Sequence, residues 1–227
     1  MAIAFKTSGR AQFDTPAASS INIAFDLSNT AGSLLVAGIS WSSGGLGNAP
    51  TSVTDTRGNS WTLYSTPVYD SPNAQGLTFA YAVNCAAGAN TVTVNYGTAS
   101  DYQRVTVAEY SGVATSSPID IVASNVAANT NATDNVTSTA ATTTVNGDLI
   151  WGHSQKDNGF VTQAPGTGFT QREYLASDYL AEDLIQATAG SIAATWTYNV
   201  ASNYLAFMVA FKAQATATTY PIYWYKG

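Results

Sequence analysis

Few side chains of this chain could carry out catalysis, and none of them stands in a spacing that a known mechanism requires. His153 is the only histidine among the 227 residues, so a serine–histidine–aspartate triad would need it, with Asp148 or Asp157 as the acid. The chain has no Gly-x-Ser-x-Gly segment to present a nucleophilic serine. His153 follows Trp151-Gly152 at the end of an expected strand, so we expect it to serve packing or the surface.

Paired carboxylates are the other catalytic arrangement to consider, because two of them at the right separation can hydrolyse a glycosidic bond. Glu182 and Asp183 are neighbours in the sequence, so on a strand they would point to opposite faces. Glu109 and Glu173 are the remaining candidates, and nothing in the spacing brings any two of the four together. We therefore predict no catalytic residues and a protein that is not an enzyme.

Metal and cofactor chemistry finds little support in the sequence. The turn Asp55–Asn59 carries oxygen ligands, but turns use Asp, Gly and Asn for backbone reasons, and this one lacks the ligands of a calcium loop. Cys85 is the only cysteine, which excludes an intramolecular disulfide and a thiolate cluster. It ends an apolar run and is expected to be a buried small hydrophobe. We predict neither a metal site nor a cofactor.

Aromatic side chains offer two candidate binding surfaces. Trp41 precedes the glycine-rich segment 42–47 and is the first candidate for stacking on a glycan, together with Tyr64 and Tyr69. The C-terminal tail is the second, because exposed aromatic rings are costly in water. The tail either folds back onto its own chain or docks on a neighbouring subunit. The tail residues expected to bind a partner are Tyr220, Ile222, Tyr223, Trp224 and Tyr225.

The composition limits the partners. Charged residues make up only 10% of the chain, against a typical ~25%, and the net charge is −6. No cluster of Lys and Arg is present, so we expect no nucleic-acid partner and no binding to an anionic membrane. No segment approaches the ~20 apolar residues of a membrane span. The N-terminus does not read as a secretory signal peptide, and we expect a virion or extracellular location reached without one.

The elements that must position these residues are strands. Residues 21–27 alternate between apolar and polar, as do residues 91–96, which is typical of half-buried strands. Leu34–Ile39 is a continuous apolar run, which predicts a central strand covered on both sides. About a dozen such strands joined by short turns predict an all-β protein, a jelly-roll-like antiparallel sandwich. In the second half, strands are expected at 149–153, 169–174, 179–187, 192–198 and 204–212.

The second half of the chain repeats the first. Asp101–Ala108 matches Asn203–Ala210, and Ala31–Gly38 matches Asn146–His153. Ala87-Gly88 matches Ala189-Gly190, and Trp61-Thr62 falls opposite Phe169-Thr170, all in the same order. We predict a β-sandwich over residues 1–213, with related halves at about 20–113 and 120–213, and a tail at 214–227. The halves either interlock into one jelly roll, which we favour, or form two tandem immunoglobulin-like sandwiches.

Several of these segments carry a resemblance to a known group of proteins. The pattern runs through Val53-Thr54-Asp55, Gly58-Asn59 and Trp61-Thr62, continues over 81–94, and ends at Glu109–Val113. Over roughly residues 20–212 the chain resembles a β-sandwich module of bacterial extracellular proteins, which also occurs among uncharacterised structural proteins of tailed phages. The resemblance implies an exposed binding, adhesive or decorating role, and it carries over no active site.

The function that we expect is that of a non-enzymatic structural protein of an extracellular assembly, in first place a phage virion decoration, fibre or tail component. Its partners would then be copies of itself or other virion proteins. The alternative is a carbohydrate-binding or adhesive module that uses loop aromatics on surface glycans. A glycoside hydrolase is the weakest of the three.

Overall fold

Antiparallel strands form almost the whole of the molecule. The computed structural model describes residues 2–14, 16–42, 45–127, 135–157, 162–175 and 178–215. Within these ranges one short 3-10 turn, η1 (Gly45–Asn48), interrupts the strands. The all-β sandwich that the sequence predicts is therefore confirmed.

The first half contains the strands that build one large sheet and a smaller one behind it. The order of the large sheet is β1-β8-β3-β7-β5, with β6 added on β7, while β2 and β4 pair with the other end of β8. The long strand β8 serves both, because Thr91–Tyr96 pairs with β2 and β4, and residues 101–111 pair with β1 and β3. The strands are β1 (Ala4–Phe13), β2 (Ala18–Ala24), β3 (Leu34–Ser42), β4 (Pro50–Asp55), β5 (Thr62–Leu63), β6 (Val68–Asp70), β7 (Gln75–Ala82) and β8 (Thr91–Ser111).

The second half has the same plan. Its large sheet has the order β9-β18-β12-β15-β14, and its outer layer consists of β10-β17-β13 and the pair β11-β16. The strands are β9 (Ile119–Ala127), β10 (Asn135–Thr137), β11 (Ala141–Thr142), β12 (Asp148–Lys156), β13 (Gln163–Pro165), β14 (Thr170–Leu175), β15 (Tyr179–Gln186), β16 (Ser191–Ile192), β17 (Thr195–Tyr198) and β18 (Tyr204–Phe211).

The two sheet orders correspond strand by strand, in agreement with the internal repeat read from the sequence. The matched segments 31–38 and 146–153 lead into and along β3 and β12, and the segments 101–108 and 203–210 lie on β8 and β18. In each half the first strand pairs with the last, and the last also pairs with the strand of the matched segment, β3 or β12.

The way in which the halves combine differs from our expectation of one interlocked jelly roll. Among the described strands every ladder joins strands of the same half. The only described bridge between the halves is an isolated one, Val113 to Ala213. That expectation was not met, because the sheet partners of every described strand lie within its own half, even where they are far apart in the sequence, as β1 and β8 are. Each half closes its own sandwich, and the halves meet through side chains.

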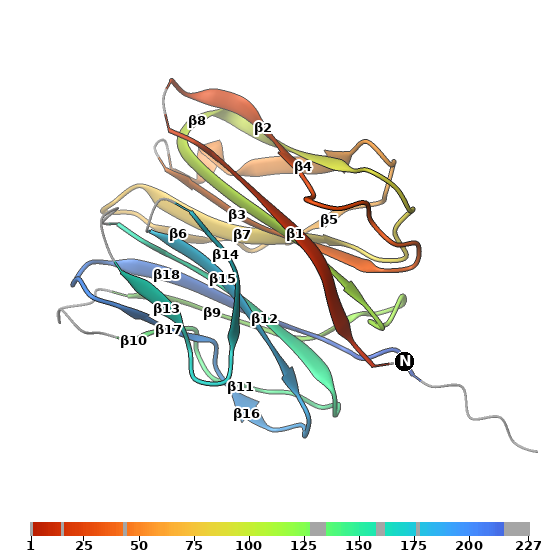
Figure 1. Cartoon of the computed structure of the whole chain (residues 1–227). Coiled ribbons are helices and arrows are strands. Elements are labelled where there is room, and N and C mark those ends of the chain that lie inside the picture. The colour runs from red at the N-terminus through yellow and green to blue at the C-terminus, as the bar shows by residue number, and fades with distance from the viewer. Residues whose placement is uncertain are drawn as a thin grey trace, which may run out of the picture.

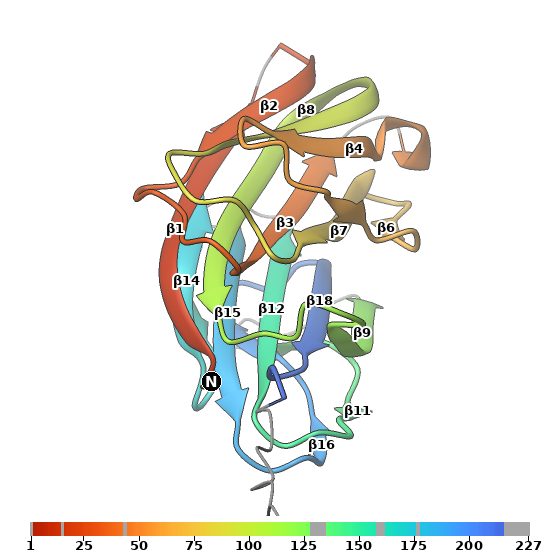
Figure 2. The same ribbon diagram turned by 90° about the vertical axis from the view of Figure 1, so that its right-hand side faces the viewer.

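Four layers result, and Figure 1 shows them stacked, with the first half above and the second below. One core fills the first half, between its large sheet and the β2, β4 layer. Another fills the second half. A third core lies between the two large sheets, and we call this region the junction. Figure 2 shows β1 running along the edge of the molecule beside β14, so the edges of the two large sheets also meet.

The junction explains the continuous apolar run of β3. Leu35 and Ala37 face the core of the first half, whereas Leu34 and Val36 face the junction. Because both faces of β3 are covered, alternation disappears from its sequence. The prediction of a central strand at 34–39 is therefore confirmed.

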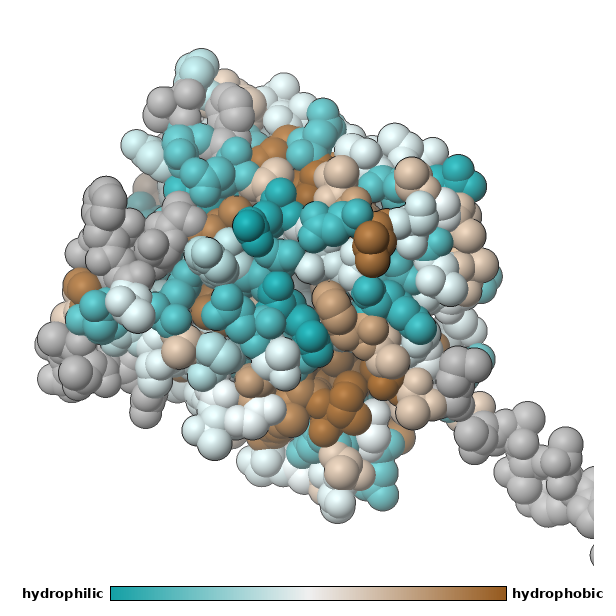
Figure 3. Space-filling view, in the orientation of Figure 1, coloured by the Kyte–Doolittle hydropathy of each residue, from teal (hydrophilic) through white to brown (hydrophobic). Residues whose placement is uncertain are grey.

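The outer surface is polar but carries little charge. Figure 3 shows one face, on which hydrophilic and weakly polar residues predominate and a group of hydrophobic residues lies over the second half. Large hydrophobic side chains that remain exposed within the described ranges are Leu27, Leu46, Tyr102, Val126, Tyr174 and Ile185.

Candidate functional site

The candidate carboxylates lie in different layers of the molecule. Glu109 shares a face of β8 with Val105 and Val107, which belong to the core of the first half. On β15, Asp183 faces the junction, and Glu182 faces the core of the second half, because successive side chains of a strand alternate. These three carboxylates therefore do not converge on one cleft.

Each of these groups is engaged in structural bonds. Glu109 is fully buried and accepts hydrogen bonds from Asn29 Nδ2 and the Thr30 backbone N–H, both at 2.8 Å. Asp183 accepts a bond from the Tyr110 hydroxyl at 2.6 Å across the junction, and two from Arg172 at 2.6 and 2.9 Å. These short bonds hold each carboxylate in a fixed position.

Glu173 ties β14 to β1, which belongs to the other half. Its two oxygens accept hydrogen bonds from the Ser8 hydroxyl and from Arg10 Nη1, each at 2.6 Å. Arg10 also lies over the ring of Tyr174, with 5.5 Å to the ring centroid. This carboxylate closes the edge of the junction that Figure 2 shows along β1.

Glu182 has the most perturbed environment of the four. Its Oε2 accepts the Gly166 backbone N–H at 2.9 Å, whereas Oε1 has no hydrogen-bond partner among the described residues. Burial raises the pKa of Glu182 to about 8. Such a shift is common at active sites, but burial alone also produces it.

His153 is a packing residue of the junction. Its Nε2 lies 2.9 Å from the Thr78 carbonyl oxygen of the other half, so Nε2–H donates to that oxygen. The imidazole stacks on Phe207, with ring centroids 5.6 Å apart and planes 8° apart. Burial lowers the pKa of His153 to about 3, and the ring is neutral at physiological pH. The contacts recorded for the ring are thus a backbone carbonyl and neighbouring aromatic side chains.

Cys85 and Asp55 also have structural roles. Cys85 is buried, its thiol donates to the Thr30 carbonyl oxygen, and burial raises its pKa to about 11. The expectation of a buried small hydrophobe is confirmed. The Asp55 carboxylate accepts five hydrogen bonds, from two backbone N–H groups of its turn and from three side chains. Asp55, Asn59 and Trp61 thus organise this turn through hydrogen bonds to the Asp55 carboxylate.

The expectation that Trp41 presents an exposed ring was wrong. Trp41 is fully buried in the core of the first half, and its indole N–H donates to the Gly45 carbonyl oxygen at 3.2 Å. Its cross-strand partner on β7 is Gly76, whose missing side chain leaves room for the ring. A Cβ at that glycine would lie 2.6 Å from Trp41 Cη2. The Trp41 ring therefore occupies the space that a side chain at position 76 would otherwise fill.

Tyr64 and Tyr69 are half-buried. Tyr64 stacks on Phe79 with ring centroids 4.8 Å apart and meets Phe207 edge-on at 5.8 Å, so its ring belongs to the side of the junction. Tyr69 lies beside η1, where its hydroxyl would contact a Cβ at Gly45 at 3.3 Å. The structure does not gather Trp41, Tyr64 and Tyr69 into one exposed aromatic face.

Two other tyrosines are more exposed than these. Tyr102 and Tyr174 expose 48% and 50% of their surface. Tyr102 has φ of 49°, a left-handed conformation that is rare for a bulky residue. The five tail residues Tyr220, Ile222, Tyr223, Trp224 and Tyr225 lie outside the described residues.

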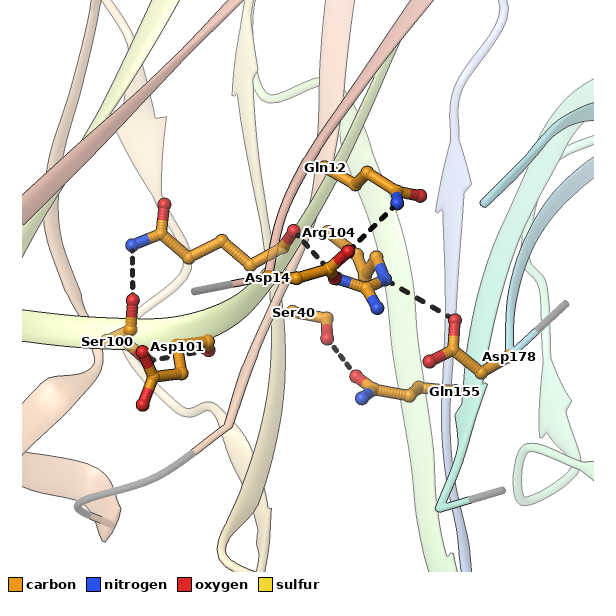
Figure 4. A network of polar contacts seen from close by, with 9 residues as sticks. Gln12, Asp14, Ser40, Ser100, Asp101, Arg104, Gln155 and Asp178 are labelled. Atoms are coloured by element: carbon orange, nitrogen blue, oxygen red, sulfur yellow. Dashed lines mark hydrogen bonds and ion pairs between the residues drawn. The ribbon is translucent and has the colours of Figure 1, made fainter. Parts of the chain in front are cut away.

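A polar network occupies one end of the junction, and Figure 4 shows it. Arg104 of β8 is almost fully buried, with Nη1 2.7 Å from Asp14 Oδ1 and Nε 3.5 Å from Asp178 Oδ1. Ser40 of β3 donates to Gln155 of β12 across the junction. Burial raises the pKa of Asp178 to about 6, although Arg104 acts in the opposite direction. The network thus joins the halves through buried polar groups.

A second polar group lies at the same end, where β6 and β7 of the first half meet the end of β12. Asp70 Oδ2 accepts hydrogen bonds from Asn73 Nδ2 at 2.6 Å and Asn203 Nδ2 at 3.1 Å. Gln75 Nε2 donates to Asp157 Oδ1 at 2.9 Å, and the Asp157 backbone N–H donates to the Asn203 carbonyl oxygen at 3.2 Å. We call Asp70, Gln75, Asp157 and Asn203 the junction cluster.

Sequence reasoning missed both polar groups. Their members come from strand ends that are far apart in the chain, and no local pattern marks them as a set. The internal repeat was the one sequence signal for them, because it indicates that equivalent strands of the two halves have equivalent neighbours.

No family model, no curated protein and no solved structure matches this chain. The described residues contain no helix that is long and apolar enough to cross a membrane.

Proposed function

We propose that this chain is a non-enzymatic structural protein of an extracellular assembly, in first place a decoration, fibre or tail component of a phage virion. The observation that carries the proposal is the use of the polar side chains. The histidine and the carboxylates that could have served catalysis bond the two halves to each other or hold turns in place. Groups used in this way add rigidity to a scaffold.

The framework is suited to such a role. Three stacked cores run through four layers, and the edge strands β1 and β14 are tied by an ion pair between Arg10 and Glu173. Joined edges reduce uncontrolled strand pairing with other molecules. The surface has few long charged side chains, whose ordering in a contact would cost conformational entropy. The resemblance to phage structural proteins supports the same proposal.

Assembly would use the C-terminal tail as its connector, because its aromatic side chains would gain most from burial against a partner. The test compares the full chain with a version that ends at Ala215. Ending there retains Ala213 and Gln214, which pair with residues 113 and 112, so the sandwich itself keeps its contacts. A full-length Trp224→Ala, Tyr225→Ala variant is the matched control for chain length.

Light scattering at several concentrations would measure the mass of each version. We expect a defined oligomer for the full chain and a monomer for the shortened chain, with the double variant shifted towards monomer. If all three are monomers at every concentration, the proposal that the tail connects subunits is wrong.

Carbohydrate binding is the alternative, and the exposure of Tyr102 and Tyr174 favours it over a hydrolase. Exposed tyrosine rings provide flat apolar faces of the kind that sugars stack on. A glycan array would test it, with Tyr102→Ala and Tyr174→Ala as variants. Binding that survives both substitutions would argue against these rings.

A further inference from the structure

At one end of the junction, β1 of the first half comes close to β15 of the second. The Phe5 ring of β1 meets the Tyr110 ring edge-on, with centroids 5.7 Å apart, and the Arg172 guanidinium carbon lies 4.1 Å from the Phe5 ring centroid. Tyr110 and Arg172 both donate hydrogen bonds to Asp183 of β15. Phe5 and Asp183 are therefore at the same level of the junction.

The contacts along these two strands fix their relative direction. Ser8 of β1 donates a hydrogen bond to Glu173, and Glu173 pairs with Ala181 of β15. Ser8 is therefore at the level of Ala181, whereas Phe5 is at the level of Asp183. It follows that β1 read towards its N-terminus and β15 read towards its C-terminus approach the same end of the molecule.

Each of these strands presents an isoleucine at that end. Ile3 precedes Phe5 by two residues, packs at the rim of the junction core and is half-buried. Ile185 follows Asp183 on the junction-facing side of β15, because side chains alternate along a strand, and it exposes 44% of its surface. Figure 3 shows hydrophobic residues gathered over this part of the second half. We call Ile3, Phe5 and Ile185 the end patch.

The described part of the chain ends beside the end patch. The Gln214 backbone N–H donates to the Gly112 carbonyl oxygen at 2.8 Å, and a Cβ at Gly112 would lie 3.1 Å from the Ile3 Cα. Ala215 is the last described residue. The C-terminal tail, residues 214–227, therefore begins next to Ile3.

The composition of the tail matches an apolar surface of this kind. It carries Tyr220, Tyr223, Trp224 and Tyr225, whose rings gain from burial. Between Ala215 and Tyr220 the sequence has three threonines and no glycine, a composition that favours extended backbone. An extended spacer of this length carries the first ring up to about 17 Å from its start. Such a reach favours the patch of a neighbouring molecule over the patch at the root of the same tail.

We propose that the end patch receives the aromatic tail of a second copy of this chain, and that two copies exchange tails to form a closed dimer. This inference rests on the proposed function, in which the tail is the connector, and it names the surface on which the connector docks. Each copy gives one tail and receives one, so the contact is twofold symmetric. A twofold contact closes at two chains and does not continue into a filament.

The first test places a charge on the end patch of the full-length protein, with Ile185→Lys and Ile3→Lys as separate variants. Val126→Lys is the matched control, because Val126 is a branched residue on β9 of the same sheet as Ile185, exposes 39% of its surface and lies outside the end patch. Light scattering at several concentrations measures the mass, and circular dichroism checks that each variant is folded. If one patch variant does not fold, the other carries the test.

We expect a dimer for the wild type and for Val126→Lys. Either patch substitution should raise the dissociation constant of the dimer roughly tenfold or more, because it places a charge where the aromatic rings dock.

The second test asks whether the tail of one molecule meets the patch of another. One full-length variant combines Ile3→Lys with Ile185→Lys and keeps its tail, and the other, Trp224→Ala with Tyr225→Ala, keeps its patch. Each alone should be monomeric at a concentration at which the wild type is fully dimeric. Mixed at concentrations well above that, they should form a one-to-one dimer through the intact tail of one and the intact patch of the other. A mixture that stays monomeric would show that tail and patch are not partners.

The outcomes separate this inference from the proposed function. A wild-type oligomer that survives both patch substitutions leaves the tail as connector but overturns the end patch as its docking surface. A wild type that is monomeric at every concentration overturns both. If Ile185→Lys then lowers the Tm of that monomer as much as the tail substitutions do, and Val126→Lys does not, the tail covers the patch of its own chain and the second copy is the wrong occupant.

Discussion

A single added methyl group at Gly38 should test whether the two large sheets are packed as closely as the structure has them. Gly38 lies on β3 at the centre of the junction. A Cβ placed there would lie 2.7 Å from Trp151 Cη2, and closer still to the Tyr179 hydroxyl. Ordinary contacts of a Cβ are about 3.4–4 Å, so the Gly38→Ala substitution forces the sheets or the rings apart.

The magnitude follows from two opposing effects. Overpacking of a core costs typically 1–3 kcal/mol, and the contact with rigid aromatic rings places this site at about 3 kcal/mol. Replacing Gly by Ala in a strand offsets about 1 kcal/mol, because it reduces the conformational entropy of the unfolded chain. A net loss of about 2 kcal/mol corresponds to a Tm lower by about 4–8 °C for a chain of this size.

Thermal unfolding followed by circular dichroism, with urea unfolding as a second measure, would determine the loss. The matched controls are Gly47→Ala and Gly190→Ala, because a Cβ at either position has no neighbour within 4 Å. If Gly38→Ala is no less stable than these two controls, the sheets do not approach each other as described, and the account of the junction is wrong.

Three further predictions concern charge and burial. Glu182→Gln should stabilise the protein increasingly as pH rises from 5 to 8. The folded-state pKa of Glu182, about 8, lies above the unfolded value, so ionisation of this carboxyl opposes folding. An equal change in unfolding free energy at pH 5 and pH 8 would contradict this. Because burial lowers the pKa of His153 to about 3, stability should fall as pH drops below about 6.5, by up to ~1.4 kcal/mol per pH unit. Urea unfolding of wild type and His153→Phe at pH 5 and pH 7 measures this contribution as the difference between the two proteins. Asp55→Ala should cost roughly 2–4 kcal/mol of unfolding free energy at pH 7, measured in urea, because it leaves five donors without their acceptor. The cost should shrink in acid, because the pKa of Asp55 is lowered in the folded state. An unchanged urea midpoint would show that water replaces the carboxylate.

Local patterns predicted the strands well, because apolar periodicity depends directly on which faces are covered. The second-half strands expected at 149–153, 179–187 and 204–212 correspond to β12, β15 and β18 within a few residues. On β8, Val105 and Val107 face the core of the first half, whereas Ala108 and Tyr110 face the junction. That β8 continues from one sheet into the other was not predicted.

Features that depend on distant pairing could not be predicted from the same patterns. The glycines after Trp41 indicated an exposed loop, but the burial of its ring depends on Gly76, which β-pairing alone brings opposite it. The junction cluster likewise needs a hairpin of one half to meet strand ends of the other. Sequence periodicity indicates that a side chain is buried, but it does not indicate which residues of the chain cover it.

Gly38 and His153 face each other across the junction, and this pairing bears on how the two repeated halves associate. These residues occupy matching positions in the repeat, and a Cβ on Gly38 would lie 3.3 Å from His153 Cδ2. In a twofold-symmetric dimer of identical subunits, residues near the axis meet their own copies, so two glycines would leave a void and two imidazoles would collide. When both halves belong to one chain, their sequences can differ, so a glycine of one half can face a histidine of the other. It also makes the association intramolecular, so dilution that would separate a dimer leaves this pair together.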